Sequence, residues 1–402
     1  MRKRIAPLLF AAGCLIALPS PAQCPAIPQT SPDINDPAQI AKVAWQIFVA
    51  GACSTATPTR YPYVQWETWI EQLQQYPATN TPGAFAAAKR EPAKRFHISP
   101  LALVIAGRSH KGTLPAVANQ NCAPGQGDPK VILCEEVRID PVASSYISAP
   151  APGATLAFRA GQSKFATAPP PPFFPPAWPN INFPWPAVEI KVDWVQYPAP
   201  CPASLKGSVW TETYGNQCYA LAGMHVISKL LPNWIWATFE PQNTGTNPSR
   251  CVVLGCDDPF GSNPAQTPPN TPGATTQMTP ALQAMMTAAN LDPVWQNYRL
   301  DGVQVLFTDG SGKATLLGNS VIEGENAGVP LDSSSCITCH HVSSINAAGK
   351  DGINNLTSNP VGNPAPYPPG FAPRDFVWSM MLACPGGVGG NCSAAGIPRK
   401  KK

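Results

Sequence analysis

Proline limits the fold of this chain more than any other residue, because it occupies 50 of the 402 positions. Proline lacks the backbone N–H group that helix interiors and central strands require. Charged residues make up only 12% of the chain, whereas hydrophobic residues make up 44%, which is enough for a core. The composition therefore predicts short helices and strands joined by long, ordered loops.

The densest proline run covers residues 168–186 and reads APPPPFFPPAWPNINFPWP. Such runs commonly form extended linkers or docking segments. This run also contains five large aromatic residues, which argue against a solvated linker. We expect it to pack along the surface of the fold.

Hydrophobic periodicity and capping residues predict several helices. Asp36 and Thr279 are placed as N-caps, and each precedes a proline at the first helical position. The predicted helices lie in residues 36–51, 64–77, the second half of 130–147, 279–291 and 373–384.

Alternation of hydrophobic and polar residues predicts the strands. It is clearest in AVEIKVDWVQY, residues 187–197, where every second residue from Val188 to Trp194 is apolar. A further strand is predicted at the start of 130–147, and two more are predicted in 218–240, separated at Pro232. Residues 302–322 predict a hairpin with its turn at residues 309–310.

The N-terminus predicts export. A basic start, MRKR, precedes the apolar run IAPLLFAAGCLIAL and a small-residue cleavage site, so residues 1–22 resemble a signal peptide. A lipoprotein signal with Cys14 lipidated is the minor alternative. The signal carries three of the formal +4 charges, and its removal leaves +1. This near-neutral charge does not favour nucleic-acid binding, and we expect no transmembrane segment.

The cysteine count agrees with an oxidising compartment. The chain has 13 cysteines, and ten remain after Cys14 and the pair at 336 and 339 are set aside. Near-neighbour spacing suggests five disulfides, although sequence alone does not decide connectivity. These are Cys24–Cys53, Cys122–Cys134, Cys201–Cys218, Cys251–Cys256 and Cys384–Cys392.

The segment SSSCITCHHVSS, residues 333–344, contains the spacing that attaches a c-type haem. Cys336 and Cys339 would form the two thioether bonds, and His340 would bind the iron from the same turn of backbone. A zinc site would need two more ligands at near spacing, and a CxxC redox site would need a thioredoxin-like context. Both are weaker interpretations, so we predict one covalent haem c.

The second axial ligand of the haem iron is open between three possibilities. His225 ranks first, because histidines are scarce and it lies in the apolar segment LAGMHVIS. Met380 ranks second, because it follows His340 by a separation similar to that in small cytochromes c. An iron position without a second protein ligand ranks third.

These features predict an α+β fold: one large, loop- and proline-rich body with mixed or antiparallel strands, which carries a short helical haem-binding segment. The expected divisions are a signal peptide at 1–22, the body at 23–333 with its proline-rich run at 168–186, a haem-bearing segment at 334–392 packed on the body, and a basic tail at 393–402.

The chain resembles an uncharacterised family of secreted bacterial proteins with a single C-terminal c-type haem motif. The resemblance covers about residues 40–380 and rests on AWQIFVA, WETW, EEVRIDPVASSYI, AVEIKVDW, HVISKLLPNWIWATFE, LLGNSVIE and SSSCITCHH, in that order. It implies haem attachment at Cys336 and Cys339 with His340 as ligand, and it includes a match for His225. It implies no reaction.

Two functional hypotheses follow. The first is an exported mono-haem protein for electron transfer, with Trp194, Trp234 and Trp236 as aromatic residues that can pack near the haem. The second is a haem enzyme, peroxidase- or oxygenase-like, because the body is much larger than a simple carrier needs. Carboxylates such as Glu189, Asp193 and Glu240 would then supply acid–base groups, although solvated strand charges or haem-propionate partners are the simpler interpretation.

Overall fold

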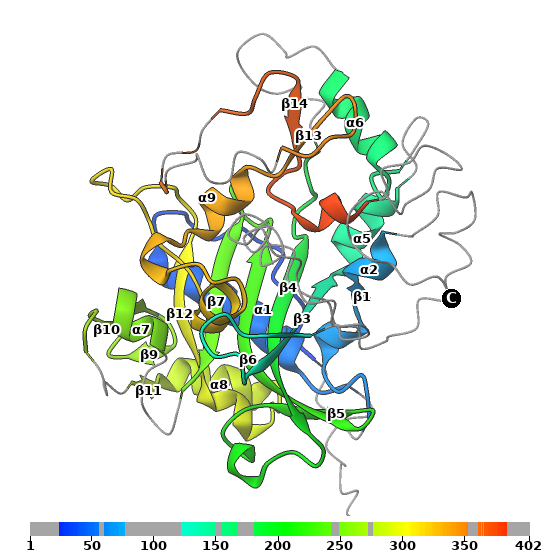
Figure 1. Ribbon diagram of the computed structural model, residues 1–402. Coiled ribbons are helices and arrows are strands. Elements are labelled where there is room, and N and C mark those ends of the chain that lie inside the picture. The colour runs from blue at the N-terminus through cyan, green and yellow to red at the C-terminus, as the bar shows by residue number, and fades with distance from the viewer. Residues whose placement is uncertain are drawn as a thin grey trace, which may run out of the picture.

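An eight-stranded antiparallel sheet forms the centre of the protein (Figure 1). The computed structural model describes residues 24–55, 60–76, 122–149, 155–167, 181–242, 249–271, 276–352, 361–362, 364 and 366–383. The strand order is β1-β3-β4-β6-β7-β12, with β2 on β3 and β5 on β6. The strands are β1 (Ile70–Glu71), β2 (Ala123–Pro124), β3 (Ile132–Ile139), β4 (Val188–Pro198), β5 (Thr211–Tyr214), β6 (Gln217–Ser228), β7 (Ile235–Pro241) and β12 (Tyr298–Gln304).

Three two-stranded sheets and several short helices surround this sheet. The small sheets pair β8 (Cys256–Asp257) with β10 (Gln266–Thr267), β9 (Ser262–Asn263) with β11 (Gln277–Met278), and β13 (Ser344–Asn346) with β14 (Phe371–Pro373). The α-helices are α1 (Pro37–Ala52), α2 (Gln72–Gln75), α5 (Pro141–Ser148), α6 (Arg159–Thr167), α7 (Ser249–Leu254), α8 (Pro280–Ala288) and α9 (Cys336–His341). The 3₁₀ helices are η1 (Gln65–Thr68), η2 (Ala203–Leu205), η3 (Pro293–Asn297), η5 (Leu331–Ser333) and η7 (Ser379–Leu382), and η4 (Ser320–Asn326) is a π-helix.

The predicted α+β body is confirmed, and the main sheet is antiparallel throughout. No helix in the described ranges combines the length and apolar character needed to cross a membrane. The predicted signal peptide, the basic tail and residues 168–180 of the proline-rich run lie outside the described residues.

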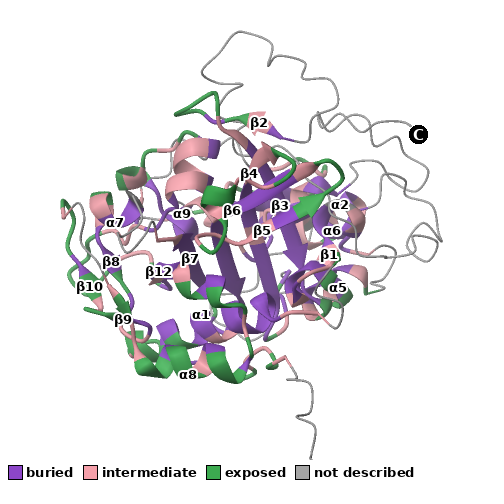
Figure 2. Cartoon of the chain, turned by 90° about the horizontal axis from the view of Figure 1, so that it is seen from below, coloured by how far each residue is buried: buried purple, intermediate pink, exposed green. Residues whose placement is uncertain are grey.

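One face of the sheet is apolar and packs against α1. The alternating residues of β4, from Val188 to Trp194, point into this core as predicted. On α1, the Trp45 and Phe48 rings lie 4.9 Å and 4.6 Å from the Phe239 ring of β7. Burial of each such side chain stabilises the fold by about 1.5–3 kcal/mol. Figure 2 shows the resulting band of buried residues along the sheet and α1.

The opposite face of the sheet carries charged side chains, and its carboxyl groups on β4 are buried. Glu189 and Asp193 of β4 are 8% and 0% exposed, so the prediction of solvated strand charges is wrong for them. Ser379 Oγ of η7 donates to Glu189 at 2.9 Å, and Asn326 Nδ2 of η4 donates to Asp193 at 2.7 Å. Segments from the C-terminal part of the chain therefore cover this face.

Prolines at helix starts and disulfides both stabilise the short elements and loops around this sheet. Pro37, Pro141 and Pro280 each occupy the first turn of a helix, where an N–H group has no intrahelical acceptor. Asp36 and Thr279 cap α1 and α8 as predicted. Four predicted disulfides are confirmed, namely Cys24–Cys53, Cys122–Cys134, Cys201–Cys218 and Cys251–Cys256. Cys384–Cys392 lies outside the described residues.

Three predicted elements differ in the structure. Residues 64–77 do not form one helix, because Ile70 and Glu71 pair with β3 and interrupt it. Residues 302–322 do not form a hairpin: 302–304 end β12, which pairs with β7, a tight turn with a bridge between Thr308 and Ala314 follows, and 320–322 begin η4. The predicted helix 373–384 becomes the end of β14 followed by the short η7, since residues 375–376 have positive φ angles of 51° and 68°.

Burial of Glu189 predicts a dependence of folding stability on pH. Burial raises the pKa of Glu189 from its ordinary 4.5 to about 7. The folded state therefore retains a proton that the unfolded state releases, and stability falls as pH rises from about 4.5 to about 7. We expect Glu189→Gln to flatten this dependence. The free energy of unfolding of the variant, relative to that of wild type, should rise by about 1–3 kcal/mol from pH 5 to pH 8. Urea unfolding of both proteins at pH 5 and at pH 8 measures this change.

Asp332→Asn is the matched control, because Asp332 is exposed on η5. This variant should keep the pH dependence of the wild-type protein. Parallel stability curves for Glu189→Gln and wild type would contradict the assignment of this titration to Glu189.

Candidate haem-attachment site

The CxxCH motif forms the short helix α9 on the charged side of the sheet. Ser335 caps the helix, and its Oγ accepts a hydrogen bond from the Thr338 backbone N–H at 3.4 Å. Cys336 and Cys339 are three residues apart on this helix, so their thiols share one side. They are the free cysteines among the described residues, Cys336 being buried and Cys339 half-buried.

The His340 ring is oriented by a backbone carbonyl. His340 Nδ1 lies 2.8 Å from the Phe376 carbonyl oxygen, so Nδ1 carries the donated proton. The imidazole then presents a basic Nε2, as a metal-ligating histidine requires. Burial lowers the pKa of His340 to about 4, so the ring is neutral at pH 7.

Aromatic rings line the surroundings of His340. The Trp236 ring of β7 lies 4.5 Å from the His340 ring, and the Trp378 ring lies 6.0 Å from it. Of the three tryptophans expected near a haem, Trp236 is therefore beside the predicted ligand. Trp194 belongs to the opposite core against α1, and Trp234 contacts Phe183.

Gln304, the last residue of β12, holds the beginning of α9. Its Oε1 accepts from the Ile337 N–H at 2.9 Å, and its Nε2 donates to Ser335 Oγ at 2.9 Å. The same Nε2 also contacts Thr315, at 2.7 Å to Oγ1. Gln304 is 3% exposed, so water does not replace these bonds. The sequence contains no signal that distinguishes this glutamine from others.

A partly buried cluster of charged residues lies on the sheet near the motif. Lys191 of β4 and His225 of β6 are direct partners in the strand register. His225 Nε2 lies 3.0 Å from both carboxylate oxygens of Glu323, and Lys191 Nζ lies 2.8 Å from Glu135. The charges of Lys191, His225 and Glu323 act electrostatically on His340, which places the cluster within reach of the motif.

The cluster stabilises its own charges. Burial alone opposes ionisation, but Glu135 and Asp193 together raise the pKa of Lys191. Burial would likewise raise the pKa of Glu323, yet His225 and Lys191 lower it below its ordinary value. Lys191 and Glu323 are therefore both charged at neutral pH, and Lys191 forms an ion pair with Glu135 on the neighbouring strand β3.

The π-helix η4 supplies the partners of this face. Three of its residues, spaced three apart, contact three sheet residues. Ser320 donates to Glu240, Glu323 pairs with His225, and Asn326 donates to Asp193 at 2.7 Å. Asn319 caps η4 and donates to Thr238 at 2.9 Å. Glu323 was not among the predicted site residues, although the typical cap residue Asn319 stands four positions before it.

The two predicted distal ligands lie in different surroundings. His225 is on the same side of the sheet as α9, and its Nε2 faces Glu323. Met380 is fully buried on η7 within a second apolar core, which also contains Cys336, Ile337 and Trp236. His341 contacts the Tyr367 hydroxyl at 3.2 Å, and His97 and His110 lie outside the described residues.

Comparisons of the chain with protein-family models, with curated proteins and with solved structures found no match.

The contacts of Gln304 predict a role in positioning α9. We expect Gln304→Ala to lower the free energy of unfolding by about 1–3 kcal/mol, because the Ile337 N–H loses its acceptor inside the protein. We also expect a smaller fraction of chains with covalently attached haem. Urea unfolding and the mass of the intact protein measure the two effects.

Gln296→Ala is the control, because Gln296 is an exposed glutamine on η3. It should leave both quantities unchanged. Wild-type stability in Gln304→Ala would rule out the positioning role.

Proposed function

We propose that this chain is an exported protein that carries one covalent haem c and transfers electrons. The proposal rests on the cysteines and the ligand histidine of α9. Its two cysteines are free while eight others are paired in disulfides, and its histidine donates through Nδ1 to a backbone carbonyl. These residues fit the attachment and ligation of a c-type haem.

A bound haem would supply reversible one-electron chemistry at its iron. The residues of this chain would hold and tune the group. Cys336 and Cys339 would anchor it, Nε2 of His340 would ligate the iron, and the Phe376 carbonyl would keep the imidazole in the right tautomer. Trp236 would shield the ligand ring from water, which supports a stable potential.

Disulfides and export support the same proposal. Disulfide bonds form and persist in the periplasm and outside the cell, where c-type haem proteins also function. We propose a periplasmic or secreted location, with the lipid anchor at Cys14 as the minor alternative. The redox partner would be a protein or a small molecule, and we expect neither nucleic acid nor a transmembrane segment to be involved.

A haem enzyme of the peroxidase or oxygenase type is the second candidate. The charged cluster favours it, because Lys191 and His225 of the sheet and Glu323 of η4 act electrostatically on His340. A histidine paired with a carboxylate is a suitable proton-transfer group beside an open iron position. The two candidates differ in whether a protein ligand, His225 or Met380, occupies the second axial position, as electron transfer favours, or whether that position is open, as the enzyme requires.

Covalent haem attachment is the first test. The full-length chain, produced together with a c-type maturation system, should gain the mass of one haem. Cys336→Ala combined with Cys339→Ala should abolish this gain, because no thiol remains to form a thioether bond. Cys201→Ala combined with Cys218→Ala is the matched control and should still gain haem. A wild-type chain without covalent haem would overturn the proposal.

The second axial ligand is tested by absorption and electron paramagnetic resonance spectra, with and without carbon monoxide. A low-spin iron that does not bind carbon monoxide supports electron transfer, whereas a high-spin iron that binds it readily supports the enzyme. If His225 is the ligand, His225→Ala should convert the iron to high spin and Met380→Ala should not. An unchanged spectrum in His225→Ala would exclude His225.

A further inference from the structure

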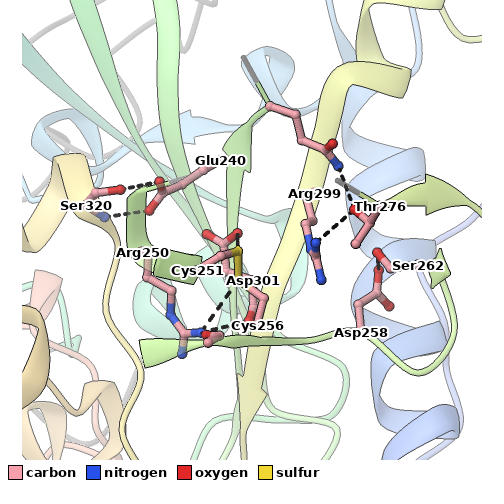
Figure 3. Close-up of a disulfide and its surroundings, with 12 residues drawn as sticks. Glu240, Arg250, Cys251, Cys256, Asp258, Ser262, Thr276, Arg299, Asp301 and Ser320 are labelled. Atoms are coloured by element: carbon pink, nitrogen blue, oxygen red, sulfur yellow. Dashed lines mark hydrogen bonds between the residues drawn. A yellow bond between two sulfur atoms is a disulfide. The ribbon is translucent and has the colours of Figure 1, made fainter. Parts of the chain in front are cut away.

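The Cys251–Cys256 disulfide lies in a buried cluster of charged residues (Figure 3). The two cysteines are 0% and 4% exposed. Asp301 Oδ1, on β12, lies 3.6 Å from each of the two sulfur atoms. Arg250 Nη1 lies 3.7 Å from the sulfur of Cys256. The sulfur pair therefore contacts a carboxyl group and a guanidinium group inside the protein.

Asp301 Oδ1 lies at the distance from each sulfur atom that a metal-binding set would have once the S–S bond is reduced. One ligand atom each from Cys251, Cys256 and Asp301 lies within 4.8 Å of the others. In a tetrahedral zinc site, Zn–S distances of about 2.3 Å and Zn–O distances of about 2.0 Å place sulfur and oxygen about 3.5 Å apart. The 3.6 Å separations here match that value.

The charges of the cluster also fit a divalent cation. Two thiolates and one carboxylate carry three negative charges. A divalent cation offsets two of them, and Arg250, whose side chain also donates to the Asp301 carbonyl at 3.0 Å, offsets the third.

Among the four disulfides of the described residues, this one restricts the conformations of the unfolded chain least. It joins residues only five positions apart, whereas the other three span 12 to 29 positions. Loop entropy lost in the unfolded state grows with loop length, so its reduction costs the fold least. Val253, between the two cysteines, and Asp257, directly after Cys256, are exposed, so this loop lies at the protein surface.

We propose that Cys251–Cys256 is a reducible disulfide whose dithiol form, together with Asp301, binds one thiophilic divalent cation such as Zn²⁺. The reductant is a dithiol. Its two thiols become a disulfide, and their two electrons and two protons convert Cys251 and Cys256 to free thiols. Zn²⁺ then binds the two sulfur atoms, whose thiol protons are released, together with the Asp301 carboxylate, and its fourth position is open to water or to another ligand. Arg250 would donate to a ligating sulfur and stabilise the thiolate.

Two measurements test the proposal, both on the full chain with Cys336→Ala and Cys339→Ala. This background removes the α9 thiols as zinc ligands and makes the result independent of haem attachment. First, the protein is titrated with a dithiol and its free thiols are alkylated and mapped by mass spectrometry. Cys251 and Cys256 should be alkylated at lower dithiol concentration than the other three described pairs.

Second, equilibrium dialysis against Zn²⁺ is carried out under conditions that reduce this pair alone. The reduced protein should bind one Zn²⁺ per chain, and the oxidised protein should bind none. Asp301→Asn should weaken binding by about tenfold or more, and Asp257→Asn, which changes an adjacent exposed carboxylate, should not. If Asp301→Asn fails to fold, Cys251→Ser combined with Cys256→Ser replaces it and should abolish binding.

The proposal is overturned if this pair is reduced only together with the other disulfides on global unfolding. It is also overturned if the reduced and oxidised proteins bind equal amounts of Zn²⁺, or if Asp301→Asn binds as tightly as the parent. Haem attachment is measured separately on the chain with intact Cys336 and Cys339, so failure of one proposal is distinguishable from failure of the other.

Discussion

The charged face of the central sheet is the constraint on which the rest of the structure depends. A buried carboxyl group without a hydrogen-bond partner costs several kcal/mol. Glu240, Asp193 and Glu189 receive their partners from residues 80, 133 and 190 positions later in the chain. The sheet therefore requires η4 and η7 to cover it, and α9 lies between these two elements in the sequence. This accounts for the late position of the CxxCH motif, in a segment that completes the body.

Proline shapes the chain without weakening the sheet. Its fixed φ angle suits the first helical turn, and α1, α5 and α8 all use it there. The loops that join these short elements are constrained by disulfides at Cys24–Cys53, Cys122–Cys134 and Cys201–Cys218, which lower the entropy of the unfolded chain. In the described part of the chain, these cross-links are distributed along a sequence that has few charges and many loops.

The candidate site divides into a part that local sequence predicts and a part that it does not. Cys336, Cys339 and His340 are close in sequence, so their spacing alone indicates the chemistry. Gln304, the Phe376 carbonyl and Glu323 contact the site from other segments, and no short-range pattern identifies them. Similarly, alternation along β4 predicted two faces correctly, but whether the charged face meets water depends on a segment more than a hundred residues away.

The sequence by itself determined the α+β class, the capped starts of α1 and α8 and the location of a CxxCH motif, and its near-neighbour cysteine spacing suggested the four disulfide pairings that the structure confirms. Each of these rests on residues that act within a short stretch or a short loop. The tertiary structure alone decided the burial of Glu189 and Asp193, the pairing of His225 with Glu323, and the contact of Asp301 with the Cys251–Cys256 sulfur atoms. These depend on long-range packing, because the environment of a side chain is set by whichever distant segment covers it.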